Sequence, residues 1–223
     1  MNKLKFLQIR AFSTALLTTA GLLTCAAVHA AGTPGASAEK VPAGQTAGDT
    51  AAAHYQTGLQ HKAAALSKET EAAAARDNTA REQLEDAARA EFEAAATAYG
   101  KALKLSLNHY EAANELGYAL RKTGEYRKAL GAYNFALVIK PDFYPAIEYR
   151  GEAYLALGMF DLAQEAYMTL FRNDLALAAQ LLEAMSEFSH EAEADETFSS
   201  WVAERQALAS VTPGGDADAN RNW

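Results

Sequence analysis

Apolar and small residues recur at an interval of 34 positions between Tyr110 and Leu177. The matched pairs are Gly117 and Gly151, Ala119 and Ala153, Gly124 and Gly158, Tyr126 and Phe160, Ala129 and Ala163, and Tyr133 and Tyr167. A period of this length predicts helix–turn–helix units that stack on copies of themselves. The two complete units are expected at residues 110–143 and 144–177. Alternating β-type stretches are scarce, so strands are not expected.

Glycine and proline mark the expected ends of the helices. Gly124 and Gly158 fall where the chain reverses after the first helix of each unit, and glycine accepts the positive φ of a helix C-cap. Lys140-Pro141-Asp142 is expected to end the second helix, because proline cannot continue one. The second unit has Leu175 in place of that proline. It is therefore expected to lead directly into a further helix.

The small residues at the repeated positions predict close helix contacts. Gly117 and Gly151 are expected where two helices cross, together with Ala129 and Ala163. The aromatic residues at the Tyr133 and Tyr167 positions are expected to fill the space between one helix pair and the next.

Residues 51–109 form an alanine-rich helical region before the first complete unit. A break is expected near Asp77-Asn78, with Asn78 or Thr79 as the cap of a second helix that runs to Leu105. Ala95, Tyr99 and Ala102 match the repeat when the sequence is shifted back by 34. Glu82 and Gln83, however, stand where an apolar and a small residue are expected. The region is therefore interpreted as a degenerate repeat with a lengthened helix, which acts as an N-terminal cap.

Residues 178–209 are expected to form C-terminal capping helices. An apolar stripe at helical spacing consists of Leu175, Leu177, Leu181, Leu182 and Met185. A shorter helix around Phe198, Trp201, Val202 and Leu208 is expected to fold back over it. The fold class expected for the whole chain is all-α, a short α-solenoid of antiparallel helix pairs with helical caps at both ends.

The chain begins with the pattern of an export signal. Residues 1–30 carry three basic residues and then a small-to-apolar run, with cleavage expected near Ala30-Ala31. Cys25 leaves lipoprotein processing as an alternative, although Thr24 before it is a poor match. Residues 31–50 and 210–223 are rich in small and polar residues and are expected to be a disordered linker and a disordered tail. The predicted location is periplasmic or secreted.

The net charge of the chain limits the classes of partner that it is expected to bind. The 223 residues carry 28 acidic and 20 basic side chains. Removal of the signal takes away Lys3, Lys5 and Arg10, so the mature chain would hold 17 basic residues and a net charge of −11. Such an acidic protein repels nucleic-acid phosphates and anionic lipid, which leaves basic or neutral polypeptides as partners.

The sequence contains no recognisable catalytic or cofactor motif. It has no nucleophile elbow, Walker-type loop or His-Glu-x-x-His motif, and its single cysteine, Cys25, lies within the signal. His54 and His61 are spaced seven apart on one helix face and leave a metal site as an alternative, but they lack the further ligands of a zinc site. We therefore expect no enzyme activity, no cofactor and no metal.

The repeated pattern closely resembles the tetratricopeptide repeat. The resemblance rests on Leu116-Gly117, Tyr118-Ala119, Gly124, Tyr126, Ala129, Tyr133, Ala136 and Pro141, and in the second unit on Gly151, Ala153, Tyr154, Gly158, Phe160, Ala163 and Tyr167. In that family the first helix of each pair lines a concave groove. The resemblance implies groove positions for Glu111, Asn114, Tyr118, Arg121, Lys122, Glu148, Glu152 and Leu155.

These residues allow two interpretations of the groove. Arg121 and Lys122 beside Asn114 would hold a carboxylate or backbone carbonyls of an extended peptide, with Tyr118 as an aromatic contact. Glu148 and Glu152 favour a partner that is basic on one side. The alternative is a solvated face of mixed charge. The expected function is a periplasmic scaffold that binds a cell-envelope polypeptide, and the other possibility is a structural protein that self-assembles as a homodimer through its helical ends.

Overall fold

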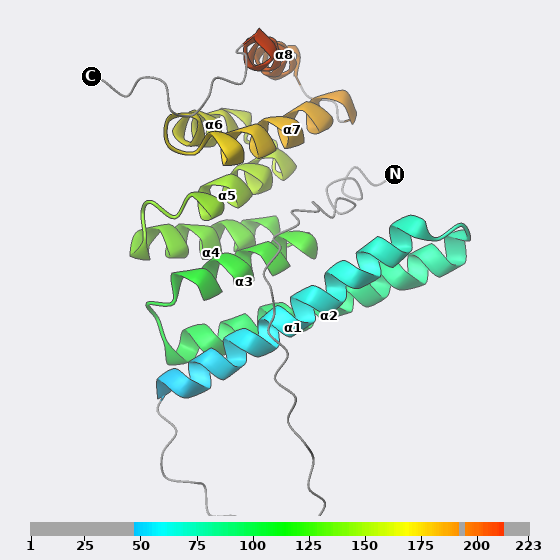
Figure 1. The fold of residues 1–223 in the computed structure, drawn as a ribbon, viewed down its shortest axis with the longest axis vertical. Helices are drawn as coiled ribbons and strands as arrows, with labels where there is room; N and C mark the ends of the chain where they lie inside the picture. The colour runs from blue at the N-terminus through cyan, green and yellow to red at the C-terminus, as the bar shows by residue number, and fades with distance from the viewer. Residues whose placement is uncertain (1–46, 192–194, 212–223) are drawn as a thin grey trace, which may run out of the picture.

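The chain folds into a stack of helix pairs, as the sequence predicts. The computed structural model describes residues 47–191 and 195–211, and this part contains eight helices and no strand. The helices are α1 (Ala47–Ala74), α2 (Asn78–Leu105), α3 (Tyr110–Lys122), α4 (Tyr126–Ile139), α5 (Tyr144–Ala156), α6 (Phe160–Asn173), α7 (Leu175–Glu191) and α8 (Glu196–Val211). Consecutive helices pack in antiparallel pairs, and each pair packs on the next (Figure 1). The all-α, solenoid-like fold is therefore confirmed.

The 34-residue period sets the positions of the helices. α3 and α5 begin 34 residues apart, and so do α4 and α6. The turn within each of these pairs is closed in the same way, because the glycines Gly124 and Gly158 have φ values of 83° and 69°. The residue after each glycine donates its N–H to a carbonyl five residues back, from Glu125 to Leu120 at 2.8 Å in the first pair. Glycine is needed here since the left-handed conformation disfavours a Cβ atom.

The connections between pairs differ in length. α4 ends before Lys140-Pro141, as expected, and a short turn leads to α5. α6, in contrast, is separated from α7 by Asp174 alone. The Asp174 N–H donates to the Leu170 carbonyl at 2.7 Å, while its carboxylate accepts from the backbone N–H groups of Ala176 and Leu177. One residue thus ends one helix and caps the next.

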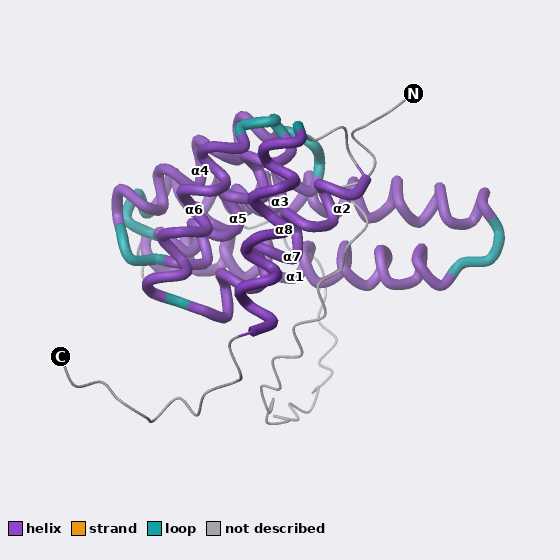
Figure 2. The backbone as a smooth tube through the Cα atoms, turned by 90° about the horizontal axis from the view of Figure 1, so that it is seen from above, coloured by secondary structure: helices purple, strands orange, loops and turns teal. Residues whose placement is uncertain are grey.

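The first pair is about twice as long as the next two pairs. α1 and α2 have 28 residues each, whereas α3 to α6 have 13 or 14. Figure 2 shows the α1–α2 hairpin extending beyond the rest of the stack. Its turn is closed by Asp77, whose carboxylate accepts from the Ala80 N–H at 2.8 Å. The prediction of Asn78 or Thr79 as the cap is wrong, because α2 already begins at Asn78.

Gly58 is the small residue that a shift of 34 fails to find in the first pair. A Cβ atom on Gly58 would lie 2.4 Å from the ring of Tyr99, just as one on Gly117 would lie 2.5 Å from the ring of Tyr133. Tyr99 and Tyr133 are 34 residues apart, but Gly58 and Gly117 are 59 apart. The 25 extra residues lengthen the hairpin. Gln83 is therefore not the counterpart of Gly117.

α7 and α8 form a fourth pair at the other end of the stack. α8 packs on α7 and also on α6, where the rings of Phe160 and Phe198 stack with centroids 4.5 Å apart. Trp201 meets Tyr167 edge-on at 5.4 Å. Tyr99, Tyr133, Tyr167 and Trp201 therefore follow one another at intervals of 34, one on the second helix of each pair.

Some predicted segments fall outside the described residues. These are the signal peptide at 1–30, including Cys25, most of the linker at 31–50, and residues 212–223 of the tail. Residues 47–50 of the predicted linker lie in α1, and residues 210 and 211 of the predicted tail lie in α8. None of the helices in the described part has both the length and the apolar character needed to cross a membrane.

Candidate functional site

The predicted groove residues come from two neighbouring helices. Glu111, Asn114, Tyr118, Arg121 and Lys122 lie on α3, and Glu148, Glu152 and Leu155 lie on α5. α3 packs mainly against α2 and α4 and also contacts α5, and side chains of α1 reach it through ion pairs. We call the resulting set of nine residues the charged cluster: Lys62, Glu69, Glu115, Tyr118, Arg121, Lys122, Glu148, Tyr149 and Glu152.

Arg121 and Glu152 join α3 to α5 through a buried ion pair. Arg121 Nη1 donates to Glu152 Oε2 at 2.5 Å, and the two residues are only 6% and 7% exposed. Burial alone would lower the pKa of Arg121, but the carboxylate of Glu152 and neighbouring groups raise it above its ordinary value. The guanidinium therefore stays charged, and breaking this pair would leave a buried charge without a partner.

Lys122 and Lys62 join α3 to the long first helix. Lys122 Nζ lies 2.7 Å from Glu69 Oε1, and Lys62 Nζ lies 2.6 Å from Glu115 Oε2. Lys122 is almost fully buried, and this burial lowers its pKa despite the nearby Glu69 carboxylate. The extension of α1 beyond Lys62 thus covers the end of α3. Arg121 and Lys122 do not form an open basic clamp.

Aromatic rings fill the space between these ion pairs. The Tyr118 ring meets Tyr149 at 5.2 Å and Phe92 at 6.0 Å, both edge-on. Lys62 Nζ lies 4.1 Å from the centroid of the Tyr118 ring, and the Arg121 guanidinium lies 5.3 Å from it. Tyr118 therefore already holds two cations of its own chain over its ring.

Glu148 is the carboxyl of the charged cluster that no cation matches. It lies one helical turn before Glu152 on α5 and is 4% exposed. Burial and the neighbouring Glu152 carboxylate raise the pKa of Glu148 well above its usual range, and Arg121 offsets only part of that rise. This rise favours the protonated form of Glu148, a carboxylic acid that can donate a hydrogen bond to Glu152.

The remaining predicted groove residues take no part in these ion pairs, although the Asn114 amide donates to Glu115 Oε1 at 3.5 Å. Glu111 is half-buried and has its Oε2 atom 3.1 Å from His109 Nδ1. Asn114 is buried, and its Oδ1 atom has no hydrogen-bond partner. Leu155 is fully buried in the apolar core, together with Leu170 and Leu181 of the following helices. Their role in binding a partner stays a prediction.

His54 and His61 do not come together in a metal site. His61 Nδ1 lies 2.8 Å from Glu91 Oε2 on α2, and this hydrogen bond lowers the pKa of Glu91. No group of three or more His, Cys, Asp or Glu side chains that could hold a metal occurs within the described ranges 47–191 and 195–211.

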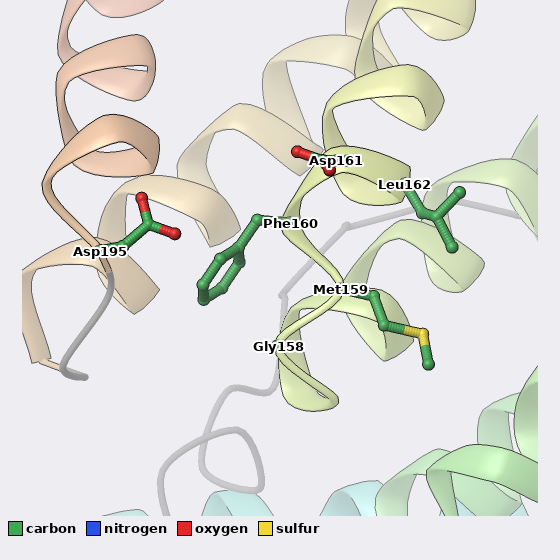
Figure 3. Close-up of a pocket in the computed structure, with 6 residues that line it drawn as sticks. All are labelled: Gly158, Met159, Phe160, Asp161, Leu162 and Asp195. Carbon is green, nitrogen blue, oxygen red and sulfur yellow. The ribbon is translucent and has the colours of Figure 1, made fainter.

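A hollow of about 370 Å³ lies elsewhere, between the α5–α6 turn and the start of α8 (Figure 3). Its lining consists of Gly158, Met159, Phe160, Asp161, Leu162 and Asp195. Asp195 is already engaged as a cap, because its Oδ1 atom accepts from the Phe198 N–H at 2.7 Å. None of these residues was predicted as a site, and none belongs to the charged cluster.

Four members of the charged cluster escaped the prediction from sequence: Lys62, Glu69, Glu115 and Tyr149. One signal for Lys62 was present, because Lys62 follows Gly58 by four residues, as Arg121 follows Gly117. The inserted residues in the first hairpin concealed this correspondence. Glu69 lies within the lengthened part of α1, where the repeat offers no equivalent position.

Comparisons with protein families and curated proteins found no match. No protein-family model matches the chain, and no curated protein sequence is significantly similar to it.

Proposed function

We propose that this chain is a non-catalytic interaction module of the tetratricopeptide type, exported to the periplasm, where it binds a segment of a cell-envelope polypeptide. The recurrence of the helix starts at 34 residues supports the family assignment, as does the packing of Gly58 and Gly117 against tyrosine rings. The signal-like residues 1–30 support export.

The observation that carries the choice of partner is the charge balance of α1, α3 and α5. Three cations of the charged cluster are paired with three carboxylates, and Glu148 remains as a surplus acid. When Glu148 is ionised, a partner with a lysine or arginine side chain would supply the missing positive charge. The net charge of the chain, −8, favours the approach of such a partner at long range.

Photo-crosslinking in cells tests this proposal. A photoreactive amino acid in place of Glu111, half-buried on α3, should trap an envelope protein. The same amino acid in place of Arg127, exposed on α4 of the same pair, is the matched control. Crosslinks from both positions to the same proteins, or from neither position, would contradict a partner site on the α3 side.

Self-association is a second candidate, favoured by exposed apolar side chains. Leu107, Val138 and Leu175 are 69%, 79% and 67% exposed, and each lies in or beside a connection between successive pairs. Exposed apolar side chains mark contact surfaces where they form a contiguous patch. Sedimentation over a range of concentrations distinguishes the candidates. A dimer that Val138→Lys dissociates supports self-assembly, and a monomer at every concentration rejects it.

A further inference from the structure

Glu148 occupies an unusual position in the contact between α3 and α5. Its carboxyl and that of Glu152 lie on one face of α5, and a single guanidinium, that of Arg121, serves both. All three residues are buried, so water cannot spread the charge of a second carboxylate. The arrangement is neutral while Glu148 holds a proton, and it has one unmatched negative charge when the proton leaves.

The other ionisable groups near this contact do not compensate that charge. Tyr118, Tyr149 and Tyr133 all have pKa values raised by burial, so they stay neutral. Lys62 and Lys122 are held by Glu115 and Glu69. Among the α6 and α7 side chains whose burial is described, the acidic, basic and histidine residues are exposed except Glu187, which is half-buried.

We propose that the Glu148 carboxyl is a proton-controlled latch: protonated, it keeps α3 closed on α5, and ionised, it opens this contact to water. An opened contact exposes the Tyr118 and Tyr149 rings and a carboxylate pair. These are the groups that a basic segment would bind. The latch therefore rests on the proposed function for its biological use, since a cationic side chain of the partner would replace the lost proton.

Titration of the full-length protein without a partner tests whether the Glu148 carboxyl keeps its proton above the usual pH range of a glutamate. In protein labelled with ¹³C at the glutamate carboxyl carbons, one signal should titrate well above the usual glutamate range. That signal should be missing in Glu148→Gln and retained in Glu165→Gln, a matched change at an exposed glutamate of α6. Ordinary titration of every glutamate signal would overturn the latch. Glu152→Gln should move the Glu148 signal down, because Arg121 then faces one carboxylate only.

Hydrogen exchange tests the opening. Amide exchange in α3 and α5, corrected for the intrinsic effect of pH, should be at least about ten-fold faster at about pH 8 than at about pH 5. Exchange in α7 and α8 should change much less. Glu148→Gln should abolish the pH effect in α3 and α5. An equal increase in Glu148→Gln, or no increase in the wild type, rejects the latch.

These readouts keep the latch separate from the proposed function. A raised titration with pH-dependent opening, together with no crosslinked partner, would leave the latch standing and reject the interaction module. A crosslinked partner together with an ordinary Glu148 titration would support the interaction module and reject the latch.

Discussion

Gly58 of α1 lies directly against the ring of Tyr99 of α2, so closely that a Cβ atom would come within 2.4 Å of the ring carbon Cε1. Gly117 and Tyr133 repeat this contact in the second helix pair at 2.5 Å. Both tyrosines are fully buried, so the rings have little room to move away. The contact fixes how closely the two helices of a pair approach.

Alanine at these glycines should therefore destabilise the fold. Gly58→Ala and Gly117→Ala are each expected to lower the free energy of unfolding by about 1–3 kcal/mol through overpacking against the ring. Gly131→Ala in α4 is the matched control, because a Cβ atom on this exposed residue would meet nothing within 4 Å. It should stabilise the protein by about 0.5–1 kcal/mol. Urea unfolding measures all three, and equal effects would contradict the proposed contact.

The buried pair between Arg121 and Glu152 should behave unlike a surface pair. Arg121→Met alone is expected to cost about 3–5 kcal/mol, because it leaves buried carboxylates without a cation. Adding Glu152→Leu should restore part of that loss, which a double-mutant cycle measures. Lys128 and Glu125, an exposed ion pair on the same helix pair, provide the control. Their coupling should be below about 1 kcal/mol, and a similar value for both pairs would refute the distinction.

Stability should fall as the pH rises, owing to Glu148. The pKa of Glu148 is raised in the folded state, so folding binds its proton more tightly than the unfolded chain does. The associated stability is fully present below the unfolded pKa near 4.5 and is lost as the pH rises through the folded pKa. Over this window the slope should approach about 1.4 kcal/mol per pH unit. Chemical unfolding at a series of pH values should lose this slope in Glu148→Gln, and an unchanged slope would argue against the assignment.

The tip of the long hairpin should depend on Asp77. Asp77→Ala removes the acceptor for the Ala80 N–H and is expected to cost about 0.5–2 kcal/mol. The neighbouring change Thr79→Ala should stay within about 0.5 kcal/mol, because Thr79 is exposed and does not cap the helix. Hydrogen exchange should show the Asp77→Ala effect first at the start of α2. A larger effect from Thr79→Ala would contradict this cap.

The repeat predicted the fold well wherever its period is unbroken. Gly124, Gly158 and Lys140-Pro141 set the helix ends, because each acts through its own backbone and needs no distant partner. The 34-residue period did not identify Gly58 as the counterpart of Gly117, because the extra residues in the hairpin increase the distance between them in the sequence. A shift of 34 then compared Gly117 with Gln83, a residue in the extra part of the hairpin.

The candidate site was less predictable than the fold. A repeat pattern identifies the face of a helix but gives no sign of what covers it. Arg121 and Lys122 were predicted as partner-binding groove residues, and the structure shows that Glu152 and Glu69 hold them in buried pairs. Glu69 comes from the lengthened part of α1. Whether Glu69 reaches α3 depends on the angle between α1 and α3, and this angle cannot be predicted from the sequence of either helix alone.

The inserted residues also make the α1–α2 hairpin project from the stack of helices. The 25 extra positions lengthen each arm of the α1–α2 hairpin by about 19 Å of helix, so the turn between α1 and α2 stands well beyond the stack (Figure 2). Along α1, Lys62 pairs with Glu115 and Glu69 pairs with Lys122, and these pairs join α1 to α3. A sideways pull on the tip would act on these two pairs and on the packing of α2 against α3, the same helix that carries Arg121. Mechanical load on the arm and the state of the charged cluster are thus connected through α3.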